Sequence, residues 1–288
     1  MPTSLVERDL NLNGVRVPTF VYGTAWKEER TESLVRMALG AGFRGIDTAN
    51  QRRHYNEAGV GAAVRGFMEE EGIGRESLYL QSKFTYAAGQ DHRLPYDPRA
   101  GYAEQVRQSA ESSLAHLQTD YLDAYLLHGP STPYGLADAD WEAWRAMEAL
   151  WRAGTVRMIG VSNVNVEQLQ QLIDGAEVMP AIVQNRCFAR TRWDAEVRVL
   201  CHTHGVLYQG FSLLTANARE LNCEPVRRIA VRLGCSVARV VFRFCLQLGI
   251  LPLTGTTDEG HMRDDLGAYD IELRPAEMEL IEEVIQLY

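Results

Sequence analysis

The chain has 288 residues, of which 46% are hydrophobic and 23% charged, with 24 glycines and 10 prolines. A chain of this length and apolar content can bury a large core, which excludes disordered, collagen-like and disulfide-scaffold proteins. The formal net charge is -9 and no apolar stretch approaches the length of a membrane span, so we expect neither nucleic acid nor a membrane as a partner.

Five cysteines lie in the second half of the chain, an odd number without a CxxC pair. With no apolar leader among the first residues, they predict reduced thiols in a cytoplasmic protein. Cys201, with His202 and His204 close by, is a candidate metal site. Residues 194–204 have a helical pattern, however, and neighbouring residues on a helix point in different directions. We therefore expect no metal.

Short apolar strands alternate with amphipathic segments after a hairpin predicted at Asn13-Gly14. The strands are predicted at residues 21–23, 45–47, 78–83, 122–128, 156–162, 182–185, 206–211 and 249–253. The helices include residues 31–40, 58–70, 103–117, 140–152 and 166–173, and a closing helix at 275–287. Eight strand-helix repeats predict a single parallel (β/α)8 TIM barrel over residues 1–288. A doubly wound sheet is the alternative, although the GxGxxG turn of its dinucleotide-binding form is absent.

Ionisable residues end three consecutive predicted strands: Asp47, Lys83 and His128. In a barrel these ends form the active face, whereas a helix cap, a rim lysine and a core histidine are the structural alternatives. Lys83 is one of only two lysines, the other being Lys27, against 27 arginines. In a chain so rich in arginine, a position that keeps lysine favours a role that needs a compact ammonium or an amine whose pKa can shift.

Several motifs follow one another along nearly the whole chain. They are Gly23-Thr24-Ala25-Trp26-Lys27, GFRGIDTA at 42–49, NEAGVG at 56–61, Ser82-Lys83, DYLD at 120–123 through His128, GTVRMIGVSN at 154–163 and Gln184-Asn185. In this order they resemble the aldo-keto reductase superfamily. The resemblance implies a barrel that binds an extended nicotinamide cofactor without a Rossmann fold. It also implies reduction of a carbonyl by an Asp, Tyr, Lys, His tetrad, of which Asp47, Lys83 and His128 match directly.

The tyrosine of the tetrad is less directly matched, because the loop after Asp47 is two residues longer than in the family pattern. We expect Tyr55, the only phenol on that loop, to donate the proton, and His54 remains a rival acid. The resemblance implies that Lys83 lowers the pKa of the phenol, that Asp47 keeps Lys83 charged and that His128 orients the substrate oxygen.

The resemblance also implies a set of cofactor contacts, in which Phe211 takes the place of a stacking tyrosine. They are Thr24, Ser162, Asn163, Gln184, Phe211, Ser212, Leu214, Gly255, Thr256, His261 and Asp265. The usual Lys and Arg that grip the extra phosphate of NADP are missing, and His261 stands near the arginine position. Backbone N–H groups at 255–257, Arg263 and Lys27 remain candidate phosphate contacts. We expect NADP(H), with NAD(H) also open.

The substrate pocket is expected to include Trp26, His54 and Tyr86. Many relatives wall this pocket with a long C-terminal loop, and here Tyr96, Tyr134 and a lid at residues 84–99 are the candidates for that wall.

The predicted function is NAD(P)H-dependent reduction of a small aldehyde or ketone by a monomer or small homo-oligomer. The alternative is a cofactor-binding redox sensor or regulatory subunit with little turnover. An unrelated barrel lyase or metal hydrolase is disfavoured, because no HxH pair or carboxylate-bridged metal set ends the strands.

Overall fold

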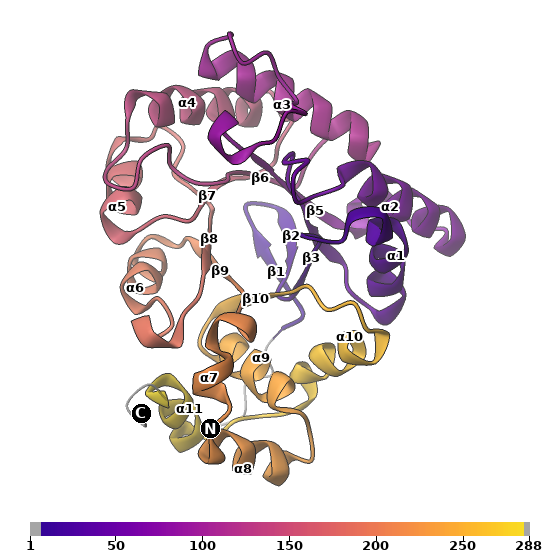
Figure 1. The fold of residues 1–288 in the computed structure, drawn as a ribbon, viewed down its shortest axis with the longest axis vertical. Coiled ribbons are helices and arrows are strands. Elements are labelled where there is room, and N and C mark those ends of the chain that lie inside the picture. Colours follow the sequence, from indigo (N-terminus) through magenta and orange to yellow (C-terminus); the bar gives the residue numbers. More distant parts are fainter. Residues whose placement is uncertain (1–6, 285–288) are drawn as a thin grey trace.

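The computed structural model describes residues 7–284, and its centre is a closed barrel of eight parallel strands (Figure 1). The strand order around the barrel is β10-β3-β4-β5-β6-β7-β8-β9. The strands are β3 (Val21–Gly23), β4 (Gly45–Asp47), β5 (Tyr79–Phe84), β6 (Ala124–Leu127), β7 (Ile159–Ser162), β8 (Ile182–Arg186), β9 (Leu207–Phe211) and β10 (Ile250–Thr254). The predicted barrel is therefore confirmed.

Helices surround the barrel, as the ring of coiled ribbons in Figure 1 shows. The α-helices are α1 (Thr31–Ala41), α2 (Glu57–Glu71), α3 (Tyr102–Leu117), α4 (Asp138–Arg152), α5 (Val166–Gly175), α6 (Ala195–His204), α7 (Ala218–Leu221), α8 (Glu224–Leu233), α9 (Val237–Gln247), α10 (Glu259–Leu266) and α11 (Pro275–Glu282). Short 3-10 helices are η1 (Glu28–Arg30), η2 (Arg75–Ser77), η3 (Ala87–Gly89), η4 (Ala189–Thr191), η5 (Thr215–Asn217) and η6 (Gly267–Asp270). Among the described residues, no helix combines the length and apolarity needed to cross a bilayer.

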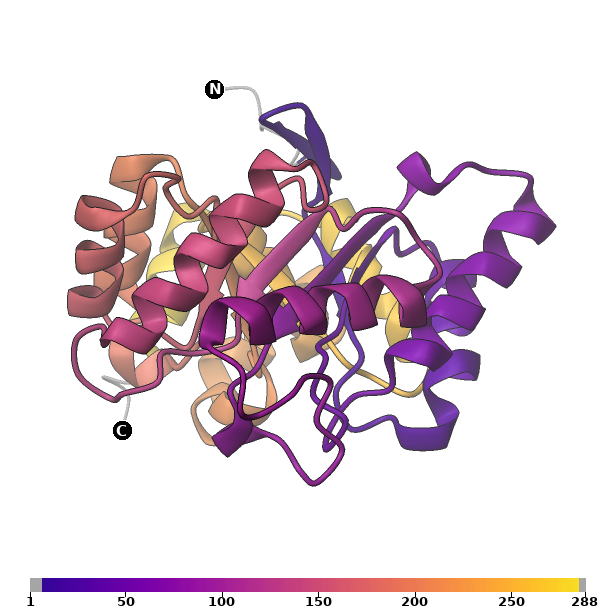
Figure 2. The same ribbon diagram turned by 90° about the horizontal axis from the view of Figure 1, so that it is seen from above.

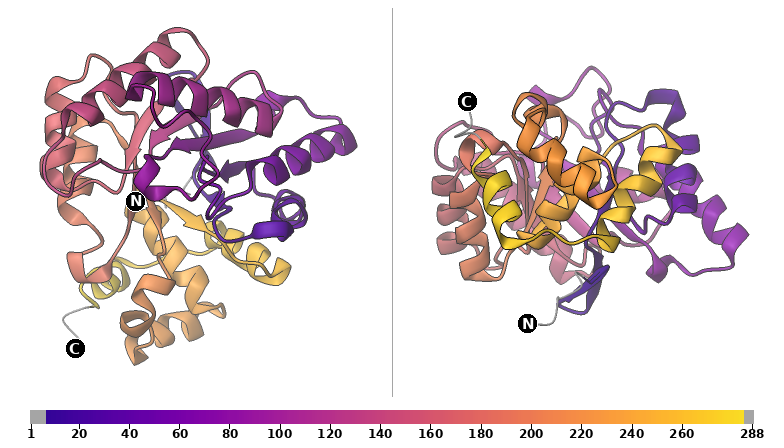
Figure 3. Two further views of the ribbon diagram at one scale, coloured as in Figure 1. Left: turned by 45° about the horizontal axis from the view of Figure 1, so that its top comes forward. Right: turned by 90° about the horizontal axis from the view of Figure 1, so that it is seen from below.

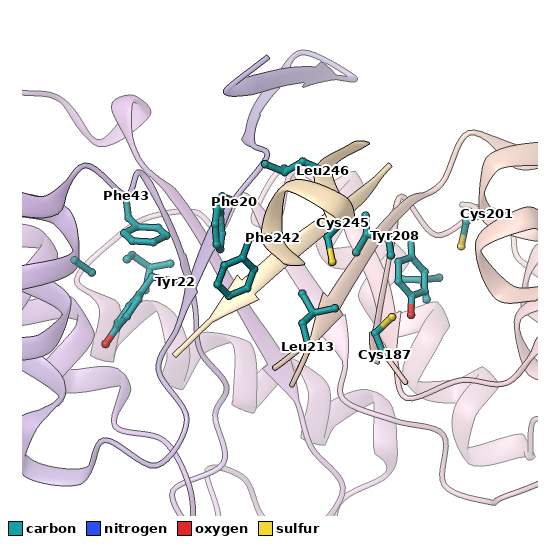
Figure 4. Close-up of a cluster of buried hydrophobic side chains, with 14 of the residues drawn as sticks. Phe20, Tyr22, Phe43, Cys187, Cys201, Tyr208, Leu213, Phe242, Cys245 and Leu246 are labelled. Carbon is teal, nitrogen blue, oxygen red and sulfur yellow. The ribbon is translucent and has the colours of Figure 1, made fainter. Parts of the chain in front are cut away.

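The core lies between the strands and the helices that cover them. All six residues of β5 are buried, as expected for a parallel strand with both faces covered. The ring of Phe20 packs against Phe43 and Phe242, with centroid distances of 5.5 and 4.8 Å. Figure 4 shows these rings together with Leu213, which follows β9 in the chain. Phe242 and Leu213 also reach the cavity described below, so this core supports one of its walls.

An antiparallel hairpin of β1 (Asp9–Leu12) and β2 (Val15–Pro18) closes one end of the barrel. Its turn residues Asn13 and Gly14 have φ values of 53° and 81°, the left-handed pair that a two-residue hairpin turn requires. Val15 and Val17 pack with the barrel residue Leu126 in a second apolar cluster. Figures 2 and 3 show the hairpin projecting from one end of the molecule, away from the long loop after β5. The opposite end is therefore the one left free for a site.

Several predicted boundaries differ from the observed ones. The strand predicted at 122–128 shortens to β6 and that at 156–162 to β7, because Leu122 and Val156 are joined only by an isolated bridge. The strand predicted from residue 249 begins at Ile250, since Gly249 has a left-handed φ of 79°. The closing helix predicted at 275–287 is α11, which ends at Glu282, and residues 285–287 lie outside the described residues.

Candidate active site

A cavity of about 750 Å³ opens where the carboxyl ends of the barrel strands meet. Most of the side chains predicted for the site lie on its wall. These are Trp26, Asp47, His54, Tyr55, His128, Ser162, Asn163, Gln184, Phe211, Ser212, Leu214, Gly255, Thr256, His261 and Asp265. The structure thus brings together residues from seven of the eight strand ends, and Lys83 at the end of β5 lies directly behind Asp47.

Asp47 and Lys83 form a buried ion pair between the adjacent strands β4 and β5. The Lys83 Nζ atom lies 2.7 Å from each carboxylate oxygen of Asp47 and 2.9 Å from the Thr48 carbonyl oxygen. Burial lowers the pKa of Lys83, and the Asp47 carboxylate opposes that shift. An ammonium has three N–H donors, so these three acceptors satisfy it and fix its position.

A layer of glutamine side chains holds Asp47 from inside the barrel. Gln81 and Gln184 donate Nε2–H groups to Asp47 Oδ1 at 2.6 and 3.0 Å. Both also donate to Gln209 Oε1 at 2.9 Å. The carboxylate that holds Lys83 is therefore itself anchored from β5 and β8. Sequence reasoning missed Gln81 and Gln209, because a contact across 128 residues leaves no local signal.

Tyr55 lies beside this pair on the loop between β4 and α2. Its ring centroid is 5.5 Å from Lys83 Nζ and 6.0 Å from the His128 ring. Burial raises the pKa of Tyr55, and the Asp47 carboxylate raises it further. The lowering expected from Lys83 does not outweigh these two causes, because Lys83 is paired with Asp47 at 2.7 Å. The phenol is consequently held in its protonated form, which is the form that can donate a proton.

His54 lies at the mouth of the cavity rather than beside Lys83. Its ring stacks on Trp26 at a centroid distance of 3.8 Å, and its Nδ1 atom lies 2.9 Å from Gln51 Oε1. Trp26 has a left-handed φ of 61° and is 66% exposed, and its backbone N–H donates to the His54 carbonyl oxygen at 2.7 Å. The two rival acids therefore differ in their neighbours: the Tyr55 ring lies near Lys83 and His128, whereas the His54 ring stacks on Trp26.

His128 follows β6 and forms the opposite side of this end of the cavity. Its Nδ1 atom lies 2.7 Å from Thr85 Oγ1, and its backbone N–H donates to the Phe84 carbonyl oxygen at 2.9 Å. Burial lowers the pKa of His128 to about 3, helped by the positive charge of Lys83. The imidazole is therefore neutral at physiological pH. Sequence reasoning missed Thr85.

The neighbouring wall offers a flat ring with amide and hydroxyl groups around it. Phe211 ends β9 and lies on the cavity wall with Asn163 and Gln184. The Asn163 side chain donates to the His128 carbonyl oxygen at 2.8 Å, and Ser162 Oγ donates to the Gln184 carbonyl oxygen at 2.6 Å. Gln184 uses its Nε2 group on Asp47 and Gln209, which leaves Oε1 as the acceptor facing the cavity. These groups fit a planar carboxamide-bearing ring such as nicotinamide.

The far end of the cavity, built by the loop after β10 and by α10, carries carboxylates. Asp265 accepts a hydrogen bond from Thr254 Oγ1 at 2.8 Å, and burial raises the pKa of Asp265 to about 7. Asp264 pairs with Arg239 at 2.6 Å, and Arg263 pairs with Glu259 at 2.6 Å. Lys27, which donates to the Gly255 carbonyl oxygen, and Arg186 are the only basic Lys or Arg side chains among the described wall residues.

Besides Lys83, two predicted site residues do not reach the cavity wall. The Thr24 hydroxyl donates to the Asp47 carbonyl oxygen at 2.9 Å. The Tyr86 hydroxyl donates to Asp140 at 2.9 Å on the side of α4, and its ring packs on Phe84.

The segment 84–99, expected to form a lid, also lies outside the wall. It instead braces the Tyr55 loop through hydrogen bonds of Gln90 to the Asn50 carbonyl oxygen and of Gln51 to the Gly89 carbonyl oxygen, both at 2.7 Å. Tyr96 is buried with its hydroxyl on the Thr85 carbonyl oxygen, and Tyr134 is 82% exposed. Within residues 7–284 no group of three or more His, Cys, Asp or Glu side chains is arranged to hold a metal.

This geometry agrees with the comparisons with known proteins. The model of the aldo/keto reductase family matches residues 19–286. The chain belongs to the aldo/keto reductase family. It is similar to the glyoxal reductase of Bacillus subtilis, with 34% identity over 98% of this chain and 94% of that protein. It is also similar to an aldo-keto reductase of Mycobacterium avium, with 33% identity over 93% of this chain and 86% of that protein.

Among solved structures, an aldo/keto reductase from Brucella melitensis has a TM-score of 0.81. The match has 28% sequence identity and covers 96% of this chain and 98% of that one. As a member of the aldo/keto reductase family, the protein is an oxidoreductase.

Proposed function

We propose that this aldo/keto reductase reduces a small aldehyde or ketone to the alcohol with a nicotinamide cofactor. The observation that carries the proposal is that Tyr55, His128 and the Asp47–Lys83 pair meet at one end of a cavity whose adjoining wall holds Phe211. The similarity to a glyoxal reductase supports a small carbonyl compound as substrate.

Each residue at the Tyr55 end of the cavity has a distinct role. The chemistry that a nicotinamide would supply when bound is a hydride for the carbonyl carbon. Tyr55 gives its phenolic proton to the oxygen on which negative charge develops, and neutral His128 orients that oxygen by a hydrogen bond. Lys83 places a fixed positive charge 5.5 Å from the ring of Tyr55 and so favours the phenolate left after proton transfer. Asp47 holds Lys83 in position.

The remaining wall would hold the cofactor. Phe211 would stack on a nicotinamide, Ser162, Asn163 and Gln184 would meet its carboxamide, and Ser212 and Leu214 would continue the groove. Gly255, Thr256, His261 and Asp265 would line the part that takes the adenosine, with Lys27 available for the pyrophosphate. Because Arg239 and Arg263 at this far end are paired with carboxylates, we infer that both NADPH and NADH serve. The free state of all five cysteines supports a reducing, cytoplasmic compartment.

The decisive experiment compares Tyr55→Phe with His54→Ala in the reduction of a panel of small aldehydes and ketones. Tyr55→Phe should lower kcat/KM by at least about a hundredfold and leave cofactor affinity nearly unchanged, since a positioned general acid contributes roughly 10² to 10⁴. His54→Ala should have a much smaller effect. The reverse order would make His54 the donor, and cofactor binding by the wild type without turnover of any carbonyl would favour the sensor alternative.

A further inference from the structure

The hydrogen bond between Thr85 and His128 determines which imidazole nitrogen carries the proton. Thr85 is 6% exposed, and its Oγ1 atom lies 2.7 Å from His128 Nδ1. A neutral imidazole has one N–H donor and one bare acceptor nitrogen, so two arrangements of this bond are chemically available. In one the hydroxyl donates to Nδ1, and in the other Nδ1–H donates to the hydroxyl.

The surroundings of Thr85 favour the first arrangement. Its hydroxyl has one hydrogen to donate, and within residues 7–284 the sole partner of Oγ1 is His128 Nδ1. If Nδ1–H were the donor, the hydroxyl hydrogen would be left without an acceptor in a buried position, which carries a desolvation cost. If the hydroxyl donates, its hydrogen has an acceptor, and the ring N–H lies at Nε2, on a residue of the cavity wall. The unused lone pairs of the hydroxyl oxygen cost less than an unpaired buried O–H.

We propose that Thr85 is a positioning residue that fixes His128 in the Nε2–H tautomer, so that a hydrogen-bond donor faces the substrate oxygen. The inference rests on the proposed carbonyl reduction. It names Thr85 as the residue that keeps His128 able to donate a hydrogen bond to the substrate oxygen. With Nδ1 engaged by Thr85, Nε2 is the ring nitrogen left for a ligand in the cavity. A bare Nε2 there would repel the lone pairs of a carbonyl oxygen, whereas Nε2–H attracts them and stabilises the charge that develops on reduction.

The backbone around Thr85 is held well enough for this role. The Thr85 carbonyl oxygen accepts hydrogen bonds from the Tyr96 hydroxyl at 2.8 Å and from Gln90 Nε2 at 3.3 Å. The preceding carbonyl, that of Phe84, accepts the His128 backbone N–H at 2.9 Å. Both partners are therefore fixed at their backbones, and the hydroxyl-to-imidazole geometry does not depend on a bound ligand.

The direct test is the ¹⁵N NMR spectrum of the histidine side chains in the wild-type protein at neutral pH. The His128 signals are assigned by their loss in His128→Gln. We expect Nδ1 of His128 to be unprotonated and Nε2 to be protonated. A protonated Nδ1 would overturn the proposal, and this reading needs neither a variant of Thr85 nor any activity.

The functional test compares Thr85→Val, which removes the hydroxyl at similar volume, with Thr85→Ser, which keeps it. Thr85→Val should populate both tautomers in the spectrum and lower kcat about tenfold, the scale of one lost hydrogen bond, with cofactor Kd little changed. Thr85→Ser should restore the wild-type tautomer and most of the activity. Ser113→Ala is the matched control, because Ser113 carries a buried hydroxyl on α3 without a partner.

The outcomes separate this proposal from the proposed function. A Thr85→Val protein with the wild-type tautomer and kcat within twofold of wild type would refute the role of Thr85. If the wild type proved unable to reduce any carbonyl, the proposed function would fail, while the spectrum would still decide the tautomer. Should Thr85→Val fold poorly, the wild-type spectrum and Thr85→Ser decide the question.

Discussion

The two ends of the cavity are built in different ways. At the catalytic end, Asp47 and Lys83 stand on strands of the barrel, and each is fixed by several hydrogen bonds. At the far end, His261 and Asp265 stand on a short helix after β10, where Arg263 and Asp264 are paired with neighbours. A change at the catalytic end disturbs a buried network across the barrel, whereas the far end can change without moving a strand. The difference agrees with the resemblance in the sequence, where Asp47, Lys83 and His128 match the family pattern and the Lys and Arg expected to bind an extra phosphate are missing.

Among the changes that test this contrast between the two ends of the cavity, Lys83→Arg is expected to have the largest effect. The larger planar guanidinium cannot reproduce the contacts of the ammonium with Asp47 and Thr48, so it should displace one of these partners. We expect a loss on the order of 3 kcal/mol of transition-state stabilisation, with little change in Tm. Measuring kcat/KM and thermal unfolding on the same preparation checks this.

Arg145→Lys, the reverse exchange at an exposed position of α4, is the matched control. It should leave kcat/KM on the carbonyl substrate within a few fold of wild type. If Lys83→Arg also stays within threefold of wild type, the ion pair has no catalytic part and the contrast between the two ends is lost.

A second prediction concerns the acid stability of the catalytic end. His128 has a folded-state pKa of about 3, below the ordinary value near 6.5. Between these values the unfolded chain binds a proton at this histidine and the folded protein does not, so stability falls as the pH drops through this window. From pH 6.5 to pH 5 this histidine should contribute a loss of about 1.5 kcal/mol in the free energy of unfolding.

Denaturant unfolding of the wild type and His128→Gln at several pH values measures this contribution. Between pH 6.5 and pH 5, His128→Gln should lose about 1.5 kcal/mol less of its free energy of unfolding than the wild type. His202→Gln, which changes an exposed histidine, should behave like the wild type. Parallel curves for wild type and His128→Gln would mean that His128 titrates normally and that this end is more hydrated than its burial indicates.

The fold could be predicted because strands that are buried on both faces leave apolar runs, as at Ala124–Leu127 and at 250–253. The site could be predicted only in part. Side chains alternate along a strand, so Lys83 and Thr85 share one side of the chain, while Phe84 and Tyr86 share the other. This alternation favours Thr85 at the site and places Tyr86 against α4, so the signal was present in the sequence.

Other features of the site leave no such signal. The hydrogen bonds of Gln81 with Gln209 join residues far apart in the chain, and which amide faces which depends on the closed barrel. The stacking of His54 on Trp26 depends in the same way on two separate loops meeting at the cavity mouth. Residue type and spacing could therefore predict the chemistry of the catalytic end, but not the partners that hold it in place.

The third prediction sharpens the description of the far end. With no Lys or Arg among residues 253–261, wild-type discrimination in favour of NADPH over NADH should stay below about a thousandfold, roughly 4 kcal/mol. His261→Arg introduces a cation on the cavity wall and should increase the preference for NADPH about tenfold, the scale of one charge-assisted contact. Titration of each cofactor by quenching of tryptophan fluorescence measures both affinities. A wild-type preference beyond a thousandfold would show that another basic group, such as Arg186, binds the extra phosphate.

The smallest effect concerns Asp265, whose carboxyl has a pKa raised to about 7 by burial. As the pH rises from 6 to 8 this carboxyl becomes charged, and a phosphate bound nearby is then repelled, so the affinity for NADPH should fall about threefold more than that for NADH. Asp265→Asn keeps the size of the side chain and removes its titration, and should abolish this difference. The ionisation of the cofactor phosphate is common to both proteins, so only the contrast between wild type and variant is informative. If the NADPH affinities of the two proteins change in parallel with pH, Asp265 lies too far from the phosphate to influence the choice of cofactor, and the preference is set by the loop 254–257 instead.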